Sequence, residues 1–136
     1  MKQSCLAPSE IESRLKAAGV QPTAQRIAIA RYVLCEADHP TAEQVKSWAD
    51  ANFPKMSMAT VYNTLNALVD AGLLKKHAFP HLNEATYDDN ITEHYHLLDE
   101  KTGRVFDLDP ADVKVTTKLK GVRIKEVDVF IRGSRA

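Results

Sequence analysis

The spacing of apolar residues along this 136-residue chain changes most clearly at about residue 84. Before that point, apolar side chains recur at every third or fourth position, which is the period of an α-helix packed on a core. After it, stretches such as HYHLLD and RVFDLD alternate as strands do. The change predicts an α+β fold with two small parts, residues 1–83 and residues 84–136.

Helix-capping residues divide the first part into four predicted helices. Thr41 and Ser57 each precede a predicted helix, and their hydroxyls can accept a hydrogen bond from its first turn. Another helix is predicted to start at Thr23. The predicted helices are, in order, Ser9 (as N-cap) to Ala18, Thr23 to about ADHP, AEQVKSWADANF and MATVYNTLNALVDAG. A short hairpin follows, formed by LLKKHAF and EATYD. This order of elements indicates a winged helix-turn-helix, which is a DNA-binding fold.

The fourth predicted helix has a face suited to DNA. At about 100° per residue, its apolar and polar residues separate onto opposite sides. The apolar stripe consists of Val61, Leu65, Leu68 and Val69, and the opposite face of Ala59, Tyr62, Asn63 and Asn66. That opposite face is uncharged, and Asn can pair with adenine while Ala or Tyr packs on a thymine methyl. A plain solvated helix face is the alternative interpretation.

Two of the five histidines stand one residue apart, in EHYHLLD. Residues i and i+2 of a strand point to the same face, so His94 and His96 present two imidazoles on one side. The neighbouring strand offers Asp107, the preceding segment Asp88, and a helix corner His39. Nitrogen and oxygen ligands without sulfur suit Fe(II), Mn(II) or Zn(II). Taken alone, the pattern also fits exposed histidines, and spacing does not bring His39 to the others.

The rest of the second part predicts a short helix and a final strand. The helix would run from Asp109 or Pro110 to about Leu119, and the strand would be GVRIKEVDVFIRG. A strand of alternating Val and Ile at this end could pair across a dimer axis.

Cysteine content and charge exclude several classes of protein. Cys5 and Cys35 form no CxxC pair, so neither a disulfide framework nor a cysteine zinc site is expected, and the two thiols are predicted to be separate. The net charge is zero, which argues against a general polyanion binder. No segment resembles a membrane span or an apolar signal sequence, so we expect a cytoplasmic protein with no membrane partner.

Three stretches resemble the ferric uptake regulator family, in the family's order and with comparable spacing. They are DHPTAEQV, SMATVYNTLNALVDAGLL and EATYDDNITEHYHLLDEKTGRVFDLD, and the resemblance runs from about Gly19 to the end. It implies a winged-helix domain, an α/β dimerisation domain and a regulatory Fe(II) or Mn(II) site between them, with Zn(II) as a substitute. His39, Asp88, His94, His96 and Asp107 fall on the family's ligand positions.

The resemblance also implies a mechanism and a partner. Asp88 and Asn63 resemble the peroxide-responsive branch of the family, in which iron and hydrogen peroxide oxidise ligand histidines, here His39 and His94. The implied partners are a second copy of the chain and a palindromic double-stranded DNA operator. The expected DNA contacts are Arg26, Ser57, Ala59, Thr60, Tyr62, Asn63, Asn66, Lys75 and Lys76. His77 and His81 are expected to be exposed in the hairpin. The absence of CxxC pairs from the sequence excludes the four-cysteine structural zinc of many members.

Three other functions stay open from the sequence. One is a reversible regulator of iron or manganese availability in the same family, with the same ligands and no oxidation chemistry. Another is a small metalloenzyme, which we do not expect because little chain is left to build a substrate pocket and a general base. The third is a winged-helix protein-interaction module without a metal.

Overall fold

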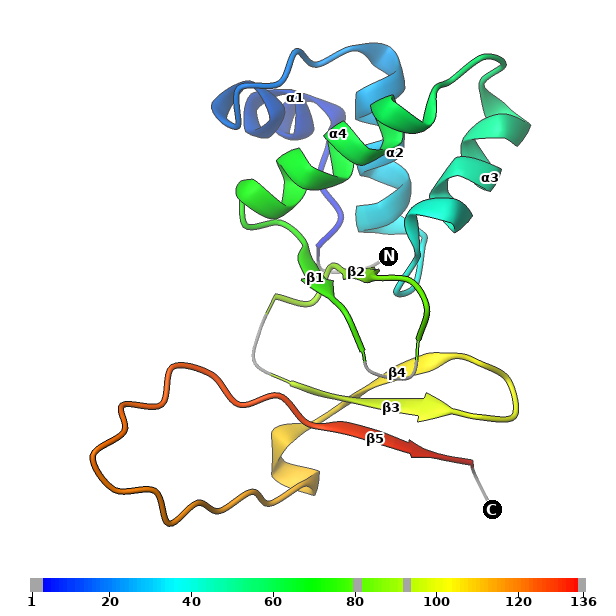
Figure 1. Cartoon of the computed structure of the whole chain (residues 1–136). Coiled ribbons are helices and arrows are strands. Elements are labelled where there is room, and N and C mark those ends of the chain that lie inside the picture. The colour runs from blue at the N-terminus through cyan, green and yellow to red at the C-terminus, as the bar shows by residue number, and fades with distance from the viewer. Residues whose placement is uncertain (1–3, 80–81, 92–93, 135–136) are drawn as a thin grey trace. The chain divides into compact units, whose positions relative to one another are not determined.

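The computed structural model describes residues 4–79, 82–91 and 94–134. The chain forms two compact units, Met1–Ile91 and Thr92–Ala136 (Figure 1). The first unit extends past residue 83 because the second strand of the predicted hairpin pairs with the first. All α-helices of the described residues lie in the first unit, and a three-stranded sheet lies in the second. The α+β prediction is confirmed.

Four helices build the first unit: α1 (Pro8–Ala17), α2 (Ala24–Cys35), α3 (Ala42–Asn52) and α4 (Met58–Asp70). The predicted N-caps Thr41 and Ser57 are confirmed, because their hydroxyls each accept a backbone N–H of the first turn. Thr23, predicted as the start of a helix, also caps α2 through its hydroxyl. The prediction for Ser9 is wrong, since α1 begins at Pro8. Proline is favoured at the first helical position, where its missing N–H has no intrahelical partner to lose. Among the described residues, no helix combines the length and the apolar character needed to cross a lipid bilayer.

The core of the first unit lies where the helices meet. Val61, Leu65 and Leu68 of α4 are fully buried, as the predicted apolar stripe requires. Helix α4 contacts each of the other three helices. Other residues of the same core are Ile11, Leu15, Ile29, Val33, Leu34 and Val45. One face of α4 is therefore fixed by packing, which leaves the opposite face to the solvent.

Cys5 and Cys35 form a disulfide, so the expectation of two separate thiols is wrong. Cys5 lies in the segment before α1, Cys35 is the last residue of α2, and their Cα atoms are 4.4 Å apart. The two cysteines are separated by 30 residues and belong to no short motif, which is why the sequence alone did not reveal the pairing. The bond attaches the start of the described chain to the end of α2.

Replacing Thr41 with alanine is expected to lower the free energy of unfolding by about 1 kcal/mol. The Thr41 hydroxyl accepts the Gln44 backbone N–H at 3.1 Å, and the Gln44 side chain accepts the Thr41 N–H at 3.0 Å. Alanine removes this reciprocal cap of α3. Urea denaturation measures the loss, with the exposed Ser47→Ala of the same helix as the control. Equal losses in both variants would contradict the capping role.

A hairpin follows α4, as predicted. Its strands β1 (Lys75–His77) and β2 (Thr86–Asp88) pair antiparallel. The corner between α2 and α3 is joined to β2, because the Tyr87 N–H donates to the Pro40 carbonyl at 2.8 Å and Thr41 forms a bridge with Thr86. These contacts place the residues of the corner beside the end of β2.

The second unit is a sheet in the order β4-β3-β5. Strands β3 (Tyr95–Asp99) and β4 (Val105–Leu108) pair antiparallel around a turn at Gly103, whose φ of 75° suits glycine. Strand β5 (Phe130–Gly133) runs parallel to β3. One edge of β5 is therefore paired with β3 of the same chain.

Two elements predicted for the second unit are wrong. The expected helix to Leu119 is only a 3₁₀ turn, η1 (Pro110–Asp112), and the final strand begins at Phe130 rather than at residue 121. The segment after η1 is rich in β-branched side chains, which lose rotamer freedom in a helix. Its members are Val113, Val115, Thr116 and Thr117. Most of this segment is exposed in the chain, so tertiary packing does not offset that cost.

Candidate metal-ligand groups and nucleic-acid surface

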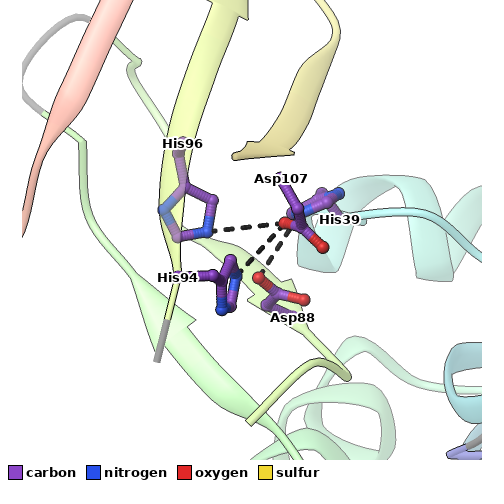
Figure 2. Close-up of side chains that lie close together, drawn as sticks. All are labelled: His39, Asp88, His94, His96 and Asp107. Atoms are coloured by element: carbon purple, nitrogen blue, oxygen red, sulfur yellow. Dashed lines mark ion pairs between the residues drawn. The ribbon is translucent and has the colours of Figure 1, made fainter. Parts of the chain in front are cut away.

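His39 lies at the corner between α2 and α3 in an unusual backbone conformation. Its φ of 47° is in the left-handed region, although a residue before proline is normally extended. Its Nδ1 lies 2.7 Å from Asp38 Oδ1, and its Nε2 lies 3.3 Å from Asp88 Oδ2 (Figure 2). An Nδ1–H donated to Asp38 leaves the lone pair of Nε2 for a metal. Asp38 thus orients the imidazole, a role that sequence reasoning missed.

Asp88 is a fully buried carboxylate at the end of β2. Its Oδ1 accepts the Asn90 N–H at 2.9 Å, while Oδ2 faces Nε2 of His39 at 3.3 Å and Nε2 of His77 at 3.7 Å. A buried carboxylate needs hydrogen bonds or a cation to offset its lost hydration. His39 and Asp88 therefore form one candidate ligand group within the first unit.

His77 is buried, with 8% of its surface exposed, so the expectation of an exposed side chain is wrong. His81 lies outside the described residues. In the register of the hairpin Lys75 faces Asp88, and His77, two residues further along β1, points to the same side. Its ring also stacks on Phe79 at 5.2 Å. The alternation in LLKKHAF indicates that His77 and Lys75 share one side of a strand. It does not show that this side is buried, which depends on the strand register.

A second candidate ligand group lies in the second unit. His94 and His96 flank Tyr95, and their ring centroids are 4.5 Å apart. Asp107 is the register partner of His96, and its Oδ1 lies 3.2 Å from His94 Nε2 and 3.8 Å from His96 Nε2 (Figure 2). One ligand atom from each of the three residues lies within 4.8 Å of the others. Both histidine side chains are buried, whereas Asp107 is 36% exposed.

The donor atoms of both groups fit a divalent transition metal. The groups offer imidazole nitrogen and carboxylate oxygen, and no cysteine contributes because both cysteines are in the disulfide. This chemistry suits Fe(II), Mn(II) or Zn(II) and excludes sites built on thiolate. Asp38 next to His39 supplies the outer hydrogen bond that metal-binding imidazoles commonly make.

The solvent face of α4 carries the residues predicted to read DNA. Ala59, Tyr62, Asn63 and Asn66 are all exposed, Tyr62 by 42%. Arg26 lines an open hollow of about 410 Å³ together with Asn63 and Asn66. The polar lining of this hollow is the guanidinium of Arg26, the amides of Gln21, Asn63 and Asn66, and the carboxylate of Asp70.

The remaining predicted DNA contacts border the same helix. The hydroxyls of Ser57 and Thr60 lie 2.9 Å apart at its N-terminus, where Ser57 also caps the helix. Lys76 is exposed on β1 and lines a hollow with Tyr62 and Tyr87, while Lys75 is half-buried. Burial raises the pKa of the Tyr87 phenol, and the nearby Tyr62 raises it further, so Tyr87 stays neutral at physiological pH.

Curated relatives share part of their length with this chain. It is 38% identical over 93 residues to the peroxide-responsive repressor PerR of Staphylococcus epidermidis, a match that covers 68% of this chain and 61% of that protein. It is 37% identical to the PerR of Staphylococcus aureus over the same number of residues. The chain thus spans less than two thirds of the length of these relatives.

Solved structures share the fold over most of the chain. The Vibrio cholerae ferric uptake regulator superimposes with a TM-score of 0.69 at 22% identity, covering 91% of this chain and 98% of that one. PerR from Streptococcus pyogenes superimposes with a TM-score of 0.54 at 25% identity, covering 95% and 90%. The model of the ferric uptake regulator family matches residues 17–131. Because that match includes both units, the protein belongs to the ferric uptake regulator family.

Proposed function

We propose that this protein is a metal-dependent, DNA-binding transcriptional repressor that responds to peroxide. The observation that carries the proposal is the presence of two sulfur-free His/Asp ligand groups, one in the unit that bears α4 and one in the other unit. Family membership and the similarity to peroxide-responsive repressors support it.

In this proposal the two groups bind one ion together. Fe(II) or Mn(II) would be held by His39, Asp88, His94, His96 and Asp107. Ligands from both units would tie the units together and so fix the angle at which each chain presents α4. In a dimer, the two helices then meet successive major grooves, about 34 Å apart. Metal binding thereby selects the conformation that binds DNA.

The proposed operator is a palindromic DNA duplex. Ala59, Tyr62, Asn63 and Asn66 would meet base edges, since their side chains suit adenine and thymine. Contacts to phosphates orient a protein on the duplex but do not select its sequence. The proposed phosphate contacts are Arg26, Ser57, Thr60, Lys75 and Lys76. This function places the protein in the cytoplasm, together with the DNA that it binds.

A homodimer is the proposed assembly. Five large apolar side chains of the second unit are exposed, and we propose that a second copy of the chain covers them. They are Val115, Leu119, Val122, Ile124 and Ile131. Covering these residues with a second copy would give this small unit the buried surface that it has too few residues to supply alone.

The proposed response to peroxide uses the ligand imidazoles themselves. A bound Fe(II) would activate hydrogen peroxide beside the ligands. Overall, one oxygen atom of the peroxide would be transferred to an imidazole ring, which loses two electrons, and the other oxygen atom would leave as water. His39 and His94 are the proposed targets, and an oxidised imidazole is a poorer nitrogen ligand, so the site then loses affinity and the protein leaves DNA. Each chain would be oxidised once and would not be regenerated, so the protein would not act as an enzyme.

Peptide mass spectrometry tests this function. The protein is loaded with Fe(II) without oxygen and then given a small excess of hydrogen peroxide, with a Mn(II)-loaded sample as control. The peptides that contain His39 or His94 are expected to gain the mass of one oxygen atom in the iron sample only. If both stay unmodified while bound iron is measured, a reversible regulator of iron or manganese availability becomes the better function, because the same ligands bind either metal.

A further inference from the structure

The disulfide has no part in the function proposed above. It joins the segment before α1 to the last residue of α2, and it contains both cysteines of the chain. Both residues are half-buried, so small oxidants and reductants can reach them. We propose that Cys5 and Cys35 are a reversible thiol–disulfide pair that is oxidised by hydroperoxides and that acts on the ligand group of the first unit.

The compartment in which the protein binds DNA favours a reversible disulfide. In compartments that hold DNA, glutathione and thioredoxin keep thiols reduced, and the disulfides that form there are usually transient or redox-sensing. DNA binding puts this chain in such a compartment, so this step rests on the proposed function. The pairing itself does not, because Cα atoms 4.4 Å apart are within the range that a disulfide spans.

The oxidation balances with hydrogen peroxide alone. One thiolate attacks the O–O bond and becomes a sulfenic acid, and the departing hydroxide takes up a proton to form water. The second thiol attacks the sulfenic sulfur, which forms the S–S bond and releases a second water. The two sulfur atoms lose two electrons and the peroxide gains two. A dithiol of the thioredoxin class reverses the reaction by exchange.

Ser4 links this pair to the ligand group of the first unit. Its hydroxyl lies 2.7 Å from the Leu34 carbonyl and 2.5 Å from Asp89 Oδ2. Leu34 precedes Cys35 in the helix that leads to His39, and Asp89 follows Asp88. The disulfide therefore holds Ser4 between the two segments that carry His39 and Asp88.

Opening the bond removes that restraint from both ligands. Ser4 and Cys5 are then no longer joined to the end of α2 by a covalent bond, so more conformational entropy is lost when Ser4 is held in place. We expect the disulfide form to bind metal more tightly, because its ligands are already ordered. The pair thus sets the metal occupancy on which oxidation of the histidines depends.

The pairing is tested on the full-length, metal-free protein. The protein is reduced with dithiothreitol, freed of it, and titrated with hydrogen peroxide in the presence of a chelator. The expected product is a single chain that is lighter by two hydrogen atoms and that links the Cys5 and Cys35 peptides in a non-reducing digest. Dithiothreitol restores the first mass. The linked form should melt about 10 °C or more above the reduced form, because the bond restricts the unfolded chain.

Three outcomes would overturn the proposed pair: thiols that stay reduced, a bond between two chains, or a bond that resists dithiothreitol in the folded protein. The chelator removes iron, so this experiment is independent of histidine oxidation and can succeed where the proposed function fails. Cys5→Ser is the control, and it should yield no linked peptides.

Coupling to the ligand group is tested with Mn(II) titrations of the reduced and linked forms. The linked form should bind Mn(II) about 10-fold more tightly, an effect of the size seen for groups that orient ligands. Ser4→Ala keeps both cysteines, so it should still form the bond but lose most of the difference in affinity. Equal affinities of the reduced and linked forms would overturn the coupling.

Discussion

The Asp88→Asn variant is expected to lose metal-dependent DNA binding. Asp88 is fully buried, and its Oδ2 faces both His39 and His77. Asparagine has nearly the same shape, so the fold should persist, but it removes the negative charge that a divalent ion needs. Altering a group that only orients a ligand costs about 10- to 100-fold in metal affinity. We expect loss of a ligand charge to cost more than about 100-fold.

Two titrations measure this effect. Mn(II) affinity is followed on the isolated protein, and DNA binding is followed on a duplex selected with the Mn(II)-loaded wild-type protein. Asp99→Asn is the matched control, because Asp99 is also buried and its Oδ1 accepts the Lys101 N–H at 2.9 Å, outside either ligand group. Mn(II) affinity in Asp88→Asn equal to that of the control would show that Asp88 is not a ligand.

The features that the sequence predicted correctly depend on neighbouring residues. The caps at Thr41 and Ser57 act within one helical turn, so a short stretch of sequence contains all the information needed. The buried stripe of α4 follows from helical period alone. The prediction of Ser9 as a cap was wrong because Pro8, just before it, also favours a helix start. The helix begins at Pro8, so Ser9 lies in its first turn.

The features that it missed depend on contacts between distant segments. The bond between Cys5 and Cys35 requires the segment before α1 to return to the end of α2. The burial of His77 requires the register of β1 on β2. The late start of the final strand at Phe130 follows from its parallel pairing with β3, whose register begins at His96. Alternation along the chain indicates a strand but does not specify its partner or its length.

The residues proposed as metal ligands show the same division. The spacing of His94 and His96 places both on one side of a strand, and the turn at Gly103 brings Asp107 opposite them. His39 and Asp88 come together through the hydrogen bond from Tyr87 to Pro40, which joins a corner to a strand distant in sequence. The sequence could therefore predict one ligand group from local geometry and the other only by resemblance to a family.

Leu65→Ala and Asn66→Ala are expected to separate the two faces of α4. Leu65 is fully buried among the other helices, and its truncation leaves a cavity that should cost about 3 kcal/mol of the free energy of unfolding. Asn66 is exposed, so its truncation should change that free energy by less than about 0.5 kcal/mol. Urea denaturation of the two variants measures both values.

DNA binding should show the reverse order at a temperature where both variants are folded. Asn66→Ala should weaken binding to the selected duplex by about 1–3 kcal/mol, the size of one good base contact, and change binding to unrelated DNA little. Leu65→Ala should bind the selected duplex nearly as the wild type does, because no part of Leu65 reaches the solvent face. Wild-type affinity and selectivity in Asn66→Ala would contradict base reading at this position, and the exposed side of α4 would then be an ordinary solvated face.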